Sequence, residues 1–348
     1  MSSVNTYLPP GEGETVFTVS STPIKFGVGA LRELGADAQG LGMTRVALFV
    51  DDHVLGTEAG ADALASLRAA GLDAVVYDHV RCEPDSDSFA AAAAFVREGA
   101  FDGFVSLGGG SVIDTAKAAN LLSTWPDDLL AYINAPIGRA KPIPGKLKPH
   151  IACPTTCGTG SETTGITIVD LKSVGLKTGI ASPLLKPTLA LIDPRTTESL
   201  PGGVVAATGF DVLTHAVESY TARPYTSRPK PAHPSQRPPY QGSTPYNDIG
   251  SLHAIRLGGR YLARAVRDAG DTEARHQLMF ASTLAGLAFG SAGVHIPHAM
   301  SYSVATLKHE FSAAGYEDRD RMVPHGIAVV INAPAAFRFT AQANPARH

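Results

Sequence analysis

Asp211 and His215 lie four residues apart in the segment Gly-Phe-Asp-Val-Leu-Thr-His-Ala-Val-Glu. On a helix, positions four apart lie on one face, so this carboxylate and this imidazole can point at the same place. Two further histidines, His298 and His325, occur in the segments His-Ala-Met-Ser-Tyr and Val-Pro-His-Gly-Ile-Ala-Val-Val. One carboxylate with three imidazoles suits a divalent transition metal with an open coordination position, which is a Lewis-acid site. Taken singly, the aspartate also fits a turn cap and each histidine an ordinary polar position.

A second motif is rich in glycine. The apolar run at 104–107 is followed by Gly108, Gly109, Gly110 and Ser111, and then by Val-Ile-Asp-Thr-Ala-Lys-Ala-Ala-Asn. This pattern predicts a buried strand, a tight turn and a helix. Glycines let the backbone approach a phosphate, and the helix N-terminus favours negative charge. The alternative is a Ser-x-x-Asp capping box made by Ser111 and Asp114, which does not require three glycines.

Two other segments fit a nucleotide site. Pro-Thr-Thr-Cys-Gly-Thr-Gly-Ser-Glu-Thr begins at Pro154 and follows the apolar run 151–153. Two glycine turns after two strands predict one extended ligand across the carboxyl edge of a parallel sheet. Asp52 follows the predicted strand 46–50, where a carboxylate binds ribose hydroxyls and repels a 2′-phosphate. The alternative for Asp52 is a turn-forming aspartate.

Taken in this order, the motifs resemble those of the iron-containing (group III) alcohol dehydrogenases. The resemblance runs from about Thr18 to the last residue and is closest to the hydroxyacid–oxoacid transhydrogenase branch. It rests on the two glycine loops, on Gly-Phe-Asp-Val-Leu-Thr-His-Ala-Val-Glu-Ser-Tyr, on His-Ala-Met-Ser-Tyr and on a proline-rich insert.

The resemblance implies roles for individual residues. It assigns the metal, and with it catalysis, to Asp211, His215, His298 and His325. It assigns the cofactor site to Asp52 (rather than Asp51), Gly108, Gly109, Gly110, Ser111, Asp114, Thr155, Thr159 and Lys177. The implied cofactors are NAD and a divalent metal, with iron(II) expected and zinc as the alternative. Two positions depart from the family pattern: Tyr302 stands where many members carry a second histidine, and Cys157 where serine or alanine is common.

The activity implied by the resemblance is hydride transfer through bound NAD. The donor would be a hydroxyacid such as 4-hydroxybutyrate, and the acceptor an oxoacid such as 2-oxoglutarate. Three alternatives remain open: a simple NAD-dependent alcohol dehydrogenase, a dehydroquinate-synthase-like lyase, and a non-catalytic nucleotide-binding fragment. The lyase would require a basic phosphate-binding cluster near the metal.

Composition bounds the class of protein. The 348 residues include 29 basic and 32 acidic side chains, a net charge of −3, so we expect small-molecule substrates and neither nucleic-acid nor membrane partners. Three cysteines are too few for a disulfide framework, which predicts a reducing cytoplasm. We also expect a homo-oligomer.

The order of predicted elements indicates an α/β fold. Strand-like runs alternate with alanine-rich helical runs, which predicts β-α-β units and a largely parallel sheet. The predicted strands are 46–50, 74–77, 104–107, 151–153, 166–169 and 189–192, and the predicted helices include 60–70, 88–98 and 111–122. We therefore predict a Rossmann-like dinucleotide-binding domain over 1–198. A helical metal-binding domain, incomplete at its C-terminus, is predicted over 199–348.

A proline-rich segment interrupts the helical half. Seven prolines between residues 223 and 245 exclude helix there and predict an extended loop. The loop is either a solvated connector or a lid or subunit contact. It carries Arg223, Arg228, Lys230 and Arg237, and its arginines are candidates to bind a substrate carboxylate.

Overall fold

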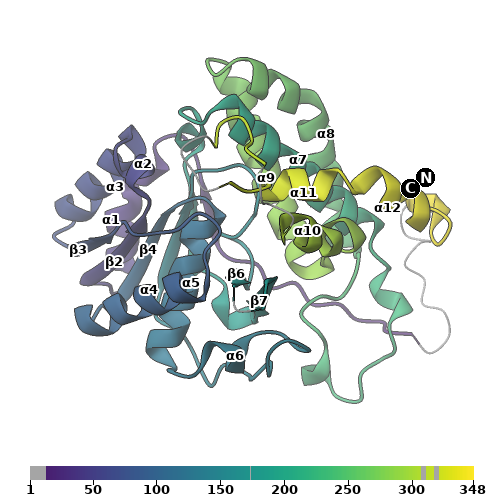
Figure 1. Ribbon diagram of the computed structural model, residues 1–348, viewed down its shortest axis with the longest axis horizontal. Helices are drawn as coiled ribbons and strands as arrows, with labels where there is room; N and C mark the ends of the chain where they lie inside the picture. Colours follow the sequence, from purple (N-terminus) through teal and green to yellow (C-terminus); the bar gives the residue numbers. More distant parts are fainter. Residues whose placement is uncertain (1–12, 173, 307–310, 317–320) are drawn as a thin grey trace. The chain divides into compact units, whose positions relative to one another are not determined.

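The computed structural model describes residues 13–172, 174–306, 311–316 and 321–348 (Figure 1). The chain forms two compact units, an α/β unit over Thr22–Thr156 and Ser161–Leu200 and a helical unit over Met1–Ser21, Cys157–Gly160 and Pro201–His348. The predicted single boundary at residue 198 lies near the end of the α/β unit at Leu200, but the helical unit also takes the segment before Thr22 and the segment Cys157–Gly160. The reason is contact: Thr18 exchanges hydrogen bonds with Gln241, and the Cys157 sulfur lies 3.5 Å from the Thr208 hydroxyl.

The α/β unit is built on a six-stranded parallel sheet in the order β1-β8-β5-β4-β2-β3. Its strands are β1 (Ile24–Phe26), β2 (Arg45–Val50), β3 (Asp73–Tyr77), β4 (Gly103–Gly108), β5 (His150–Pro154) and β8 (Leu189–Ile192). The central strands β4 and β5 are buried at every residue, as expected of a parallel sheet covered on both faces. The predicted parallel-sheet fold is confirmed.

Helices cover both faces of this sheet. Helices α1 (Leu34–Gly40) and α3 (Glu58–Ala69) lie on one face, and α4 (Ser86–Gly99) and α5 (Gly110–Thr124) lie on the other (Figure 1). Their apolar side chains form a separate core cluster with the strands on each face. The remaining short helices of the unit are η2 (Ala30–Glu33), α2 (Asp52–Leu55), α6 (Leu129–Tyr132), η3 (Pro183–Leu185) and η4 (Pro194–Thr197).

The sheet positions the predicted nucleotide loops at one edge. Val50 pairs with Leu107, and Leu107 pairs with Cys153, so β2, β4 and β5 end at the same level. The chain runs from β2 outward to β3 and then returns to β4 on the other side of β2. This reversal places a topological switch point between β2 and β4, where ligands bind in open α/β sheets.

The predicted strand 166–169 lies outside the main sheet. It belongs to β6 (Ile166–Leu171), which pairs antiparallel with β7 (Leu176–Ala181) in a separate hairpin. Buried and half-buried residues alternate along β6, which is the pattern of a strand with only one face packed. Its assignment to the β-α-β series was therefore wrong, and β1 and β7 were not predicted.

The helical unit contains six α-helices in its described part: α7 (Gly202–Thr221), α8 (Pro245–Arg267), α9 (Thr272–Ala292), α10 (Ile296–Thr306), α11 (His325–Val330) and α12 (Ala333–Thr340). Helices α7, α8 and α9 pack against one another. Short 3₁₀ turns are η5 (Tyr225–Ser227), η6 (Pro234–Gln236) and η7 (Pro345–Arg347). No single described helix meets the length and hydropathy needed for a bilayer span, although α9 and α10 together do so as a pair bent by 104°.

Candidate metal centre and nucleotide loop

Helix α7 carries two of the predicted metal ligands on one buried face. Asp211 and His215 are 2% and 4% exposed, and Glu218 on the same helix is fully buried. The four-residue spacing brings the His215 Nδ1 atom to 3.7 Å from the Asp211 Oδ1 atom. The His215 ring stacks on Phe289 of α9 at 4.0 Å and on His298 at 4.4 Å, so packing fixes its plane.

Two later helices bring the other two histidines to Asp211. The Nε2 atom of His298, near the start of α10, lies 3.3 Å from the Asp211 Oδ1 atom. The Nε2 atom of His325, the first residue of α11, lies 3.7 Å from the same oxygen. Ligand atoms of a tetrahedral ion with bonds of about 2.0–2.2 Å lie roughly 3.3–3.6 Å apart. Asp211, His298 and His325 offer ligand atoms that all lie within 4.8 Å of one another, close enough to share one ion. His215 does not belong to this group of three, and its approach to Asp211 leaves its role as a ligand a prediction.

Unsatisfied polar atoms provide an independent test of this fit. The Asp211 Oδ1, His215 Nδ1 and His298 Nε2 atoms are buried and have no hydrogen-bond partner among the described residues. A buried polar atom without a partner costs free energy, so such atoms are rare and call for a cause. A cation bound by the group Asp211, His298 and His325 would satisfy the Asp211 and His298 atoms. The side chain of His325 is 28% exposed, which makes it the solvent-facing member of the cluster.

Glu218 orients one of the candidate ligands. The His298 Nδ1 atom lies 2.7 Å from the Glu218 Oε1 atom, and an ionised carboxylate only accepts, so Nδ1 carries the hydrogen. The backbone N–H groups of His295 and His298 also donate to Glu218. Holding Nδ1 in this way directs Nε2 towards Asp211, as carboxylates commonly do behind a metal-bound histidine. The sequence reasoning missed Glu218, although it lies three residues after His215 on the same helix face.

The electrostatics of the cluster favour a positive charge. Burial alone would raise the pKa of Asp211, but the surrounding histidines hold it well below its usual range. Burial alone would lower the pKa of His298, yet the carboxylates of Asp211 and Glu218 raise it to about 9. Burial lowers the pKa of His215 to about 4, which keeps that ring neutral and able to donate an electron pair.

The glycine loop connects β4 to α5 in the α/β unit. Helix α5 begins at Gly110 with Gly109 as its N-cap residue, and no described side chain caps it. The alternative, a capping box made by Ser111 and Asp114, is therefore not formed, because Ser111 already lies inside the helix. The first N–H groups of this 15-residue helix therefore have no side-chain cap at the switch point, and such a helix end favours an anion. A Cβ atom on Gly108 would lie 2.4 Å from a methyl group of Val112, so strand–helix packing also requires glycine there.

Asp114 and Lys117 tie helix α5 to the second glycine loop. The Asp114 carboxylate accepts hydrogen bonds from the Ser161 hydroxyl at 2.6 Å and from the Ile168 N–H at 2.9 Å. The Lys117 ammonium donates to the carbonyl oxygens of Ser161, Thr164 and Ile166 at 2.7–2.9 Å. This buried network holds the loop and β6 against α5. The cofactor role predicted for Asp114 stays a prediction, and Lys117 was not singled out from the sequence.

Asp51 and Asp52 have different environments after β2. The Asp51 carboxylate accepts from the Val54 N–H at 2.8 Å and caps α2. Asp52 is exposed, and its carboxylate accepts only the N–H of His53 among the described residues. Because β2 borders the switch point, Asp52 stands one strand from the glycine loop. This placement agrees with the choice of Asp52 over Asp51 for the ribose, which stays a prediction.

The other predicted cofactor residues are distributed over both units. Thr155 is buried, and its N–H donates to the Gly108 carbonyl at 3.0 Å. Lys177 on β7 forms an ion pair of 2.9 Å with Glu83, whose own N–H donates to the Ser111 hydroxyl. Thr159 belongs to the short segment that packs with the helical unit. Thr155 therefore contacts the glycine loop directly, and Lys177 contacts it through Glu83; all of these residues belong to the α/β unit.

Two family models and several known proteins place this chain in the same family. Residues 21–194 match the family described as iron-containing alcohol dehydrogenase, and residues 240–348 match its C-terminal family. Hydroxyacid-oxoacid transhydrogenase of Bos taurus is 49% identical over 334 residues, which cover 95% of this chain and 72% of that protein. The Homo sapiens protein of the same name is 47% identical with the same coverage.

Solved structures of the family share the fold. A 1,3-propanediol oxidoreductase aligns with a TM-score of 0.81 and 29% identity, over 95% of this chain and 78% of that one. A sulfoacetaldehyde reductase from Bifidobacterium kashiwanohense in complex with NAD+ aligns with a TM-score of 0.77 and 27% identity, over 94% and 77% of the two chains. The family and its NAD-bound member support NAD and a metal as cofactors.

The relatives correct one expectation from composition. The transhydrogenases of Bos taurus, Mus musculus and Homo sapiens are named as mitochondrial proteins, which contradicts the expected cytoplasmic location. The physical reason is that a low cysteine count argues against stable disulfides and does not distinguish one compartment from another. By its two matching domains and these relatives, the chain is an oxidoreductase that belongs to the iron-containing alcohol dehydrogenase family and, within it, to the hydroxyacid-oxoacid transhydrogenase branch.

Proposed function

We propose that this protein transfers a hydride from a hydroxyacid of the 4-hydroxybutyrate type to an oxoacid of the 2-oxoglutarate type through an NAD that stays bound. The identity of 47–49% to named transhydrogenases supports the substrate class. The observation that carries the proposal is the set of unsatisfied buried atoms on Asp211, His215 and His298. These atoms support a cation in the helical unit, and the α/β unit of the same chain has an uncapped helix end.

In this proposal Asp211, His215, His298 and His325 hold the metal, and iron(II) is the proposed ion with zinc as the alternative. A ligand set of oxygen and imidazole nitrogen without thiolate suits either ion. When bound, the metal polarises the substrate oxygen and the nicotinamide carries the hydride. Glu218 keeps His298 in one tautomer and orientation, and the stacked ring of Phe289 does the same for the plane of His215.

The nucleotide is proposed to bind at the switch point of the sheet. The N–H groups at the start of α5 would face its pyrophosphate, and Asp52 would accept hydrogen bonds from its adenosine ribose. Asp114 and Lys117 hold the second glycine loop against α5, which pre-organises the site before the nucleotide arrives. We further propose a homo-oligomer that acts without a nucleic-acid or membrane partner; sedimentation velocity would measure the oligomeric state.

The test is turnover of the full-length protein with both acids and no added NAD. The donor should lose a hydride and a proton to give succinate semialdehyde, while 2-oxoglutarate gains both to give 2-hydroxyglutarate. Initial rates should show ping-pong kinetics, because the first product leaves before the second acid binds. The variant His298→Ala serves as the inactive control.

A simple NAD-dependent alcohol dehydrogenase is the second candidate. It is favoured by solved relatives whose names describe alcohol dehydrogenases and a 1,3-propanediol oxidoreductase. An absolute need for added NAD, with reduced cofactor accumulating in solution and intersecting kinetic patterns, would establish this candidate and reject the transhydrogenase.

A further inference from the structure

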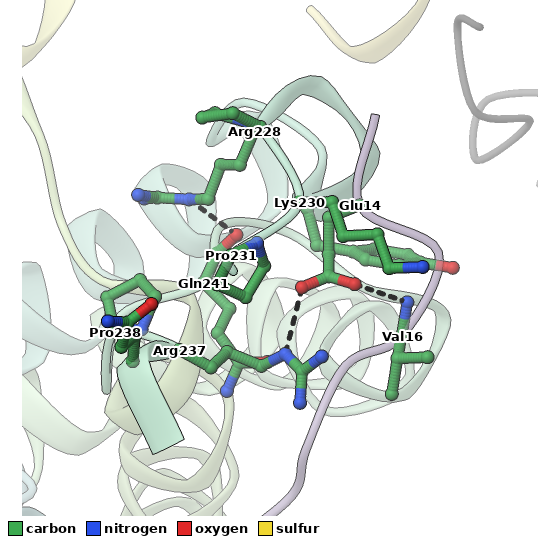
Figure 2. Close-up of a pocket in the computed structure, with 11 residues that line it drawn as sticks. Glu14, Val16, Arg228, Lys230, Pro231, Arg237, Pro238 and Gln241 are labelled. Carbon is green, nitrogen blue, oxygen red and sulfur yellow. Dashed lines mark hydrogen bonds and ion pairs between the residues drawn. The ribbon is translucent and has the colours of Figure 1, made fainter. Parts of the chain in front are cut away.

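The proline-rich segment between α7 and α8 forms a pocket of about 340 Å³ (Figure 2). The lining residues come from this loop and from the chain near the N-terminus. They are Glu14, Val16, Tyr225, Arg228, Pro229, Lys230, Pro231, Gln236, Arg237, Pro238 and Gln241. The volume falls at the lower end of the roughly 300–1,000 Å³ typical of small-molecule sites.

Backbone hydrogen bonds fix both ends of this loop. The Tyr225 N–H donates to the Ser243 carbonyl at 3.0 Å, and the Gln241 N–H donates to the Ser291 carbonyl at the end of α9 at 2.8 Å. The Glu14 N–H donates to the Arg228 carbonyl at 2.8 Å, which joins the N-terminal segment to the loop. Each proline fixes its own φ angle, which restricts the backbone conformation of the residues between these bonds. The loop that lines the pocket is therefore restrained by backbone hydrogen bonds and by its prolines.

Charge is unevenly distributed around the pocket. Three cationic side chains, Arg228, Lys230 and Arg237, face a single carboxylate, Glu14. The Arg237 Nε atom donates to the Glu14 Oε2 atom at 2.9 Å, as Figure 2 shows, and this bond lowers the pKa of Glu14. The Arg228 Nε atom donates to the Gln241 carbonyl at 2.8 Å. One cation is thus neutralised, and two positive charges remain without a carboxylate in the lining.

Arg228 and Arg237 both make these hydrogen bonds through Nε, which restrains the side chain up to the guanidinium group. The terminal nitrogens of a guanidinium then retain a planar pair of donors suited to a carboxylate. Apart from two glutamines, the remaining lining residues are Val16, Tyr225 and three prolines, which contribute apolar surface. A carbon skeleton gains from such walls, whereas a small inorganic anion would lose hydration there without apolar contact.

We propose that this pocket binds a small organic dicarboxylate, at a site separate from the metal centre. The two uncompensated charges match a dianion, and the walls match its carbon chain. None of the described lining residues is a predicted metal ligand. In Figure 1 the loop extends below α10, which carries His298. The inference goes beyond the proposed function, because ligand binding here requires neither metal nor NAD. The earlier expectation that loop arginines hold the carboxylate of the reacting acid stays a prediction.

The experiment measures binding of radiolabelled succinate to the full-length protein by equilibrium dialysis at low ionic strength. Saturable binding is expected, with a dissociation constant on the order of 0.1–1 mM. The variant Arg228→Gln/Lys230→Gln should weaken it at least about tenfold, because each charge-assisted contact contributes measurably. Lys230→Glu is the second variant; the lysine is exposed, so reversing its charge does not threaten folding.

Two control variants separate this pocket from other sites. Arg256→Gln/Arg260→Gln removes two exposed charges from α8 outside the pocket lining and should leave binding unchanged. His298→Ala disrupts the metal centre and should also leave it unchanged, even if turnover fails. Butyrate and inorganic phosphate should compete at least about tenfold less well than succinate.

Several results would overturn the proposal. These are the absence of saturable succinate binding to the unmodified protein, its loss in His298→Ala, or an equal loss in the α8 control. Competition by phosphate as strong as that by succinate would reject the organic dianion as the ligand class.

Discussion

The His298 Nδ1 atom lies 2.7 Å from the Glu218 Oε1 atom, and both side chains are buried. This contact explains how a histidine from α10 presents its other nitrogen to Asp211 on α7. It also spares Glu218 from being an uncompensated buried charge, because His298 and the backbone of His295 both donate to it. Removing either partner should therefore destabilise the site by more than the loss of one hydrogen bond, because the other side chain would remain buried without a partner.

Glu218→Gln should weaken metal binding by about 10–100-fold, since partners behind a metal-bound histidine typically contribute that much. The amide matches the carboxylate in shape but cannot stabilise the donating tautomer of His298 as strongly. Metal affinity can be measured by competition with a chromogenic chelator. Glu273→Gln, on the exposed side of α9, is the matched control. Unchanged affinity in Glu218→Gln would remove the positioning role.

His298→Ala should abolish metal binding and turnover and leave nucleotide binding intact. The reason is that the imidazole contributes one converging nitrogen in the helical unit, while the uncapped helix end lies in the α/β unit. Metal content by mass spectrometry and NADH fluorescence titration on one sample give both readouts. His253→Ala, an exposed histidine of α8, should change neither. Stoichiometric metal in His298→Ala would contradict the site.

Asp52→Gly should reduce the preference for NAD(H) over NADP(H) by roughly 1–3 kcal/mol, the scale of a close charge pair. A carboxylate beside a 2′-phosphate repels it, and glycine does not. Dissociation constants for both cofactors supply the measurement.

Asp51→Ala is the informative partner of that variant. Asp51 caps α2, so its loss should cost about 0.5–2 kcal/mol of stability and leave the cofactor preference unchanged. If Asp51→Ala changed the cofactor preference and Asp52→Gly did not, the ribose would be bound by Asp51 and the role proposed for Asp52 would be wrong.

Asp85→Asn should destabilise the α/β unit by about 1–3 kcal/mol near pH 7, the range for hydrogen bonds to a charged group. Burial alone would raise the pKa of Asp85, but bonds from Lys172 and the Ser88 N–H, with Arg81 nearby, hold it below its usual range. A depressed folded-state pKa adds stability above the unfolded value of about 4, and this stability is lost as pH falls through the folded value.

The free energies of unfolding of Asp85→Asn and the unmodified protein should therefore converge in acid. Urea unfolding at pH 7 and below pH 4 measures the difference. Asp87→Asn, at an exposed position in the first turn of the same helix, is the control. A difference that persists unchanged into acid would show that charge on Asp85 is not its source.

Much of the candidate site follows from local pattern. The interval between Asp211 and His215 equals one helical turn, so their shared direction could be predicted before any fold was known. The apolar run before Gly108 likewise predicts a strand that ends in a glycine turn. Both inferences use only the short-range geometry of helices and strands, which depends on residues a few positions apart.

Other features depend on contacts between distant segments. Local sequence does not specify that the Nε2 atom of His298 comes within 3.3 Å of Asp211, 87 positions earlier in the chain, because packing of α10 on α7 determines it. The same holds for the separate β6–β7 hairpin, for burial of Lys117 and for the partnership of Glu218 with His298. Periodicity predicted most of the parallel strands and the helices between them, but not β1, β7 or the pairing of β6. Only the tertiary structure decided which faces meet, since burial and hydrogen bonding across long separations are properties of the assembled core.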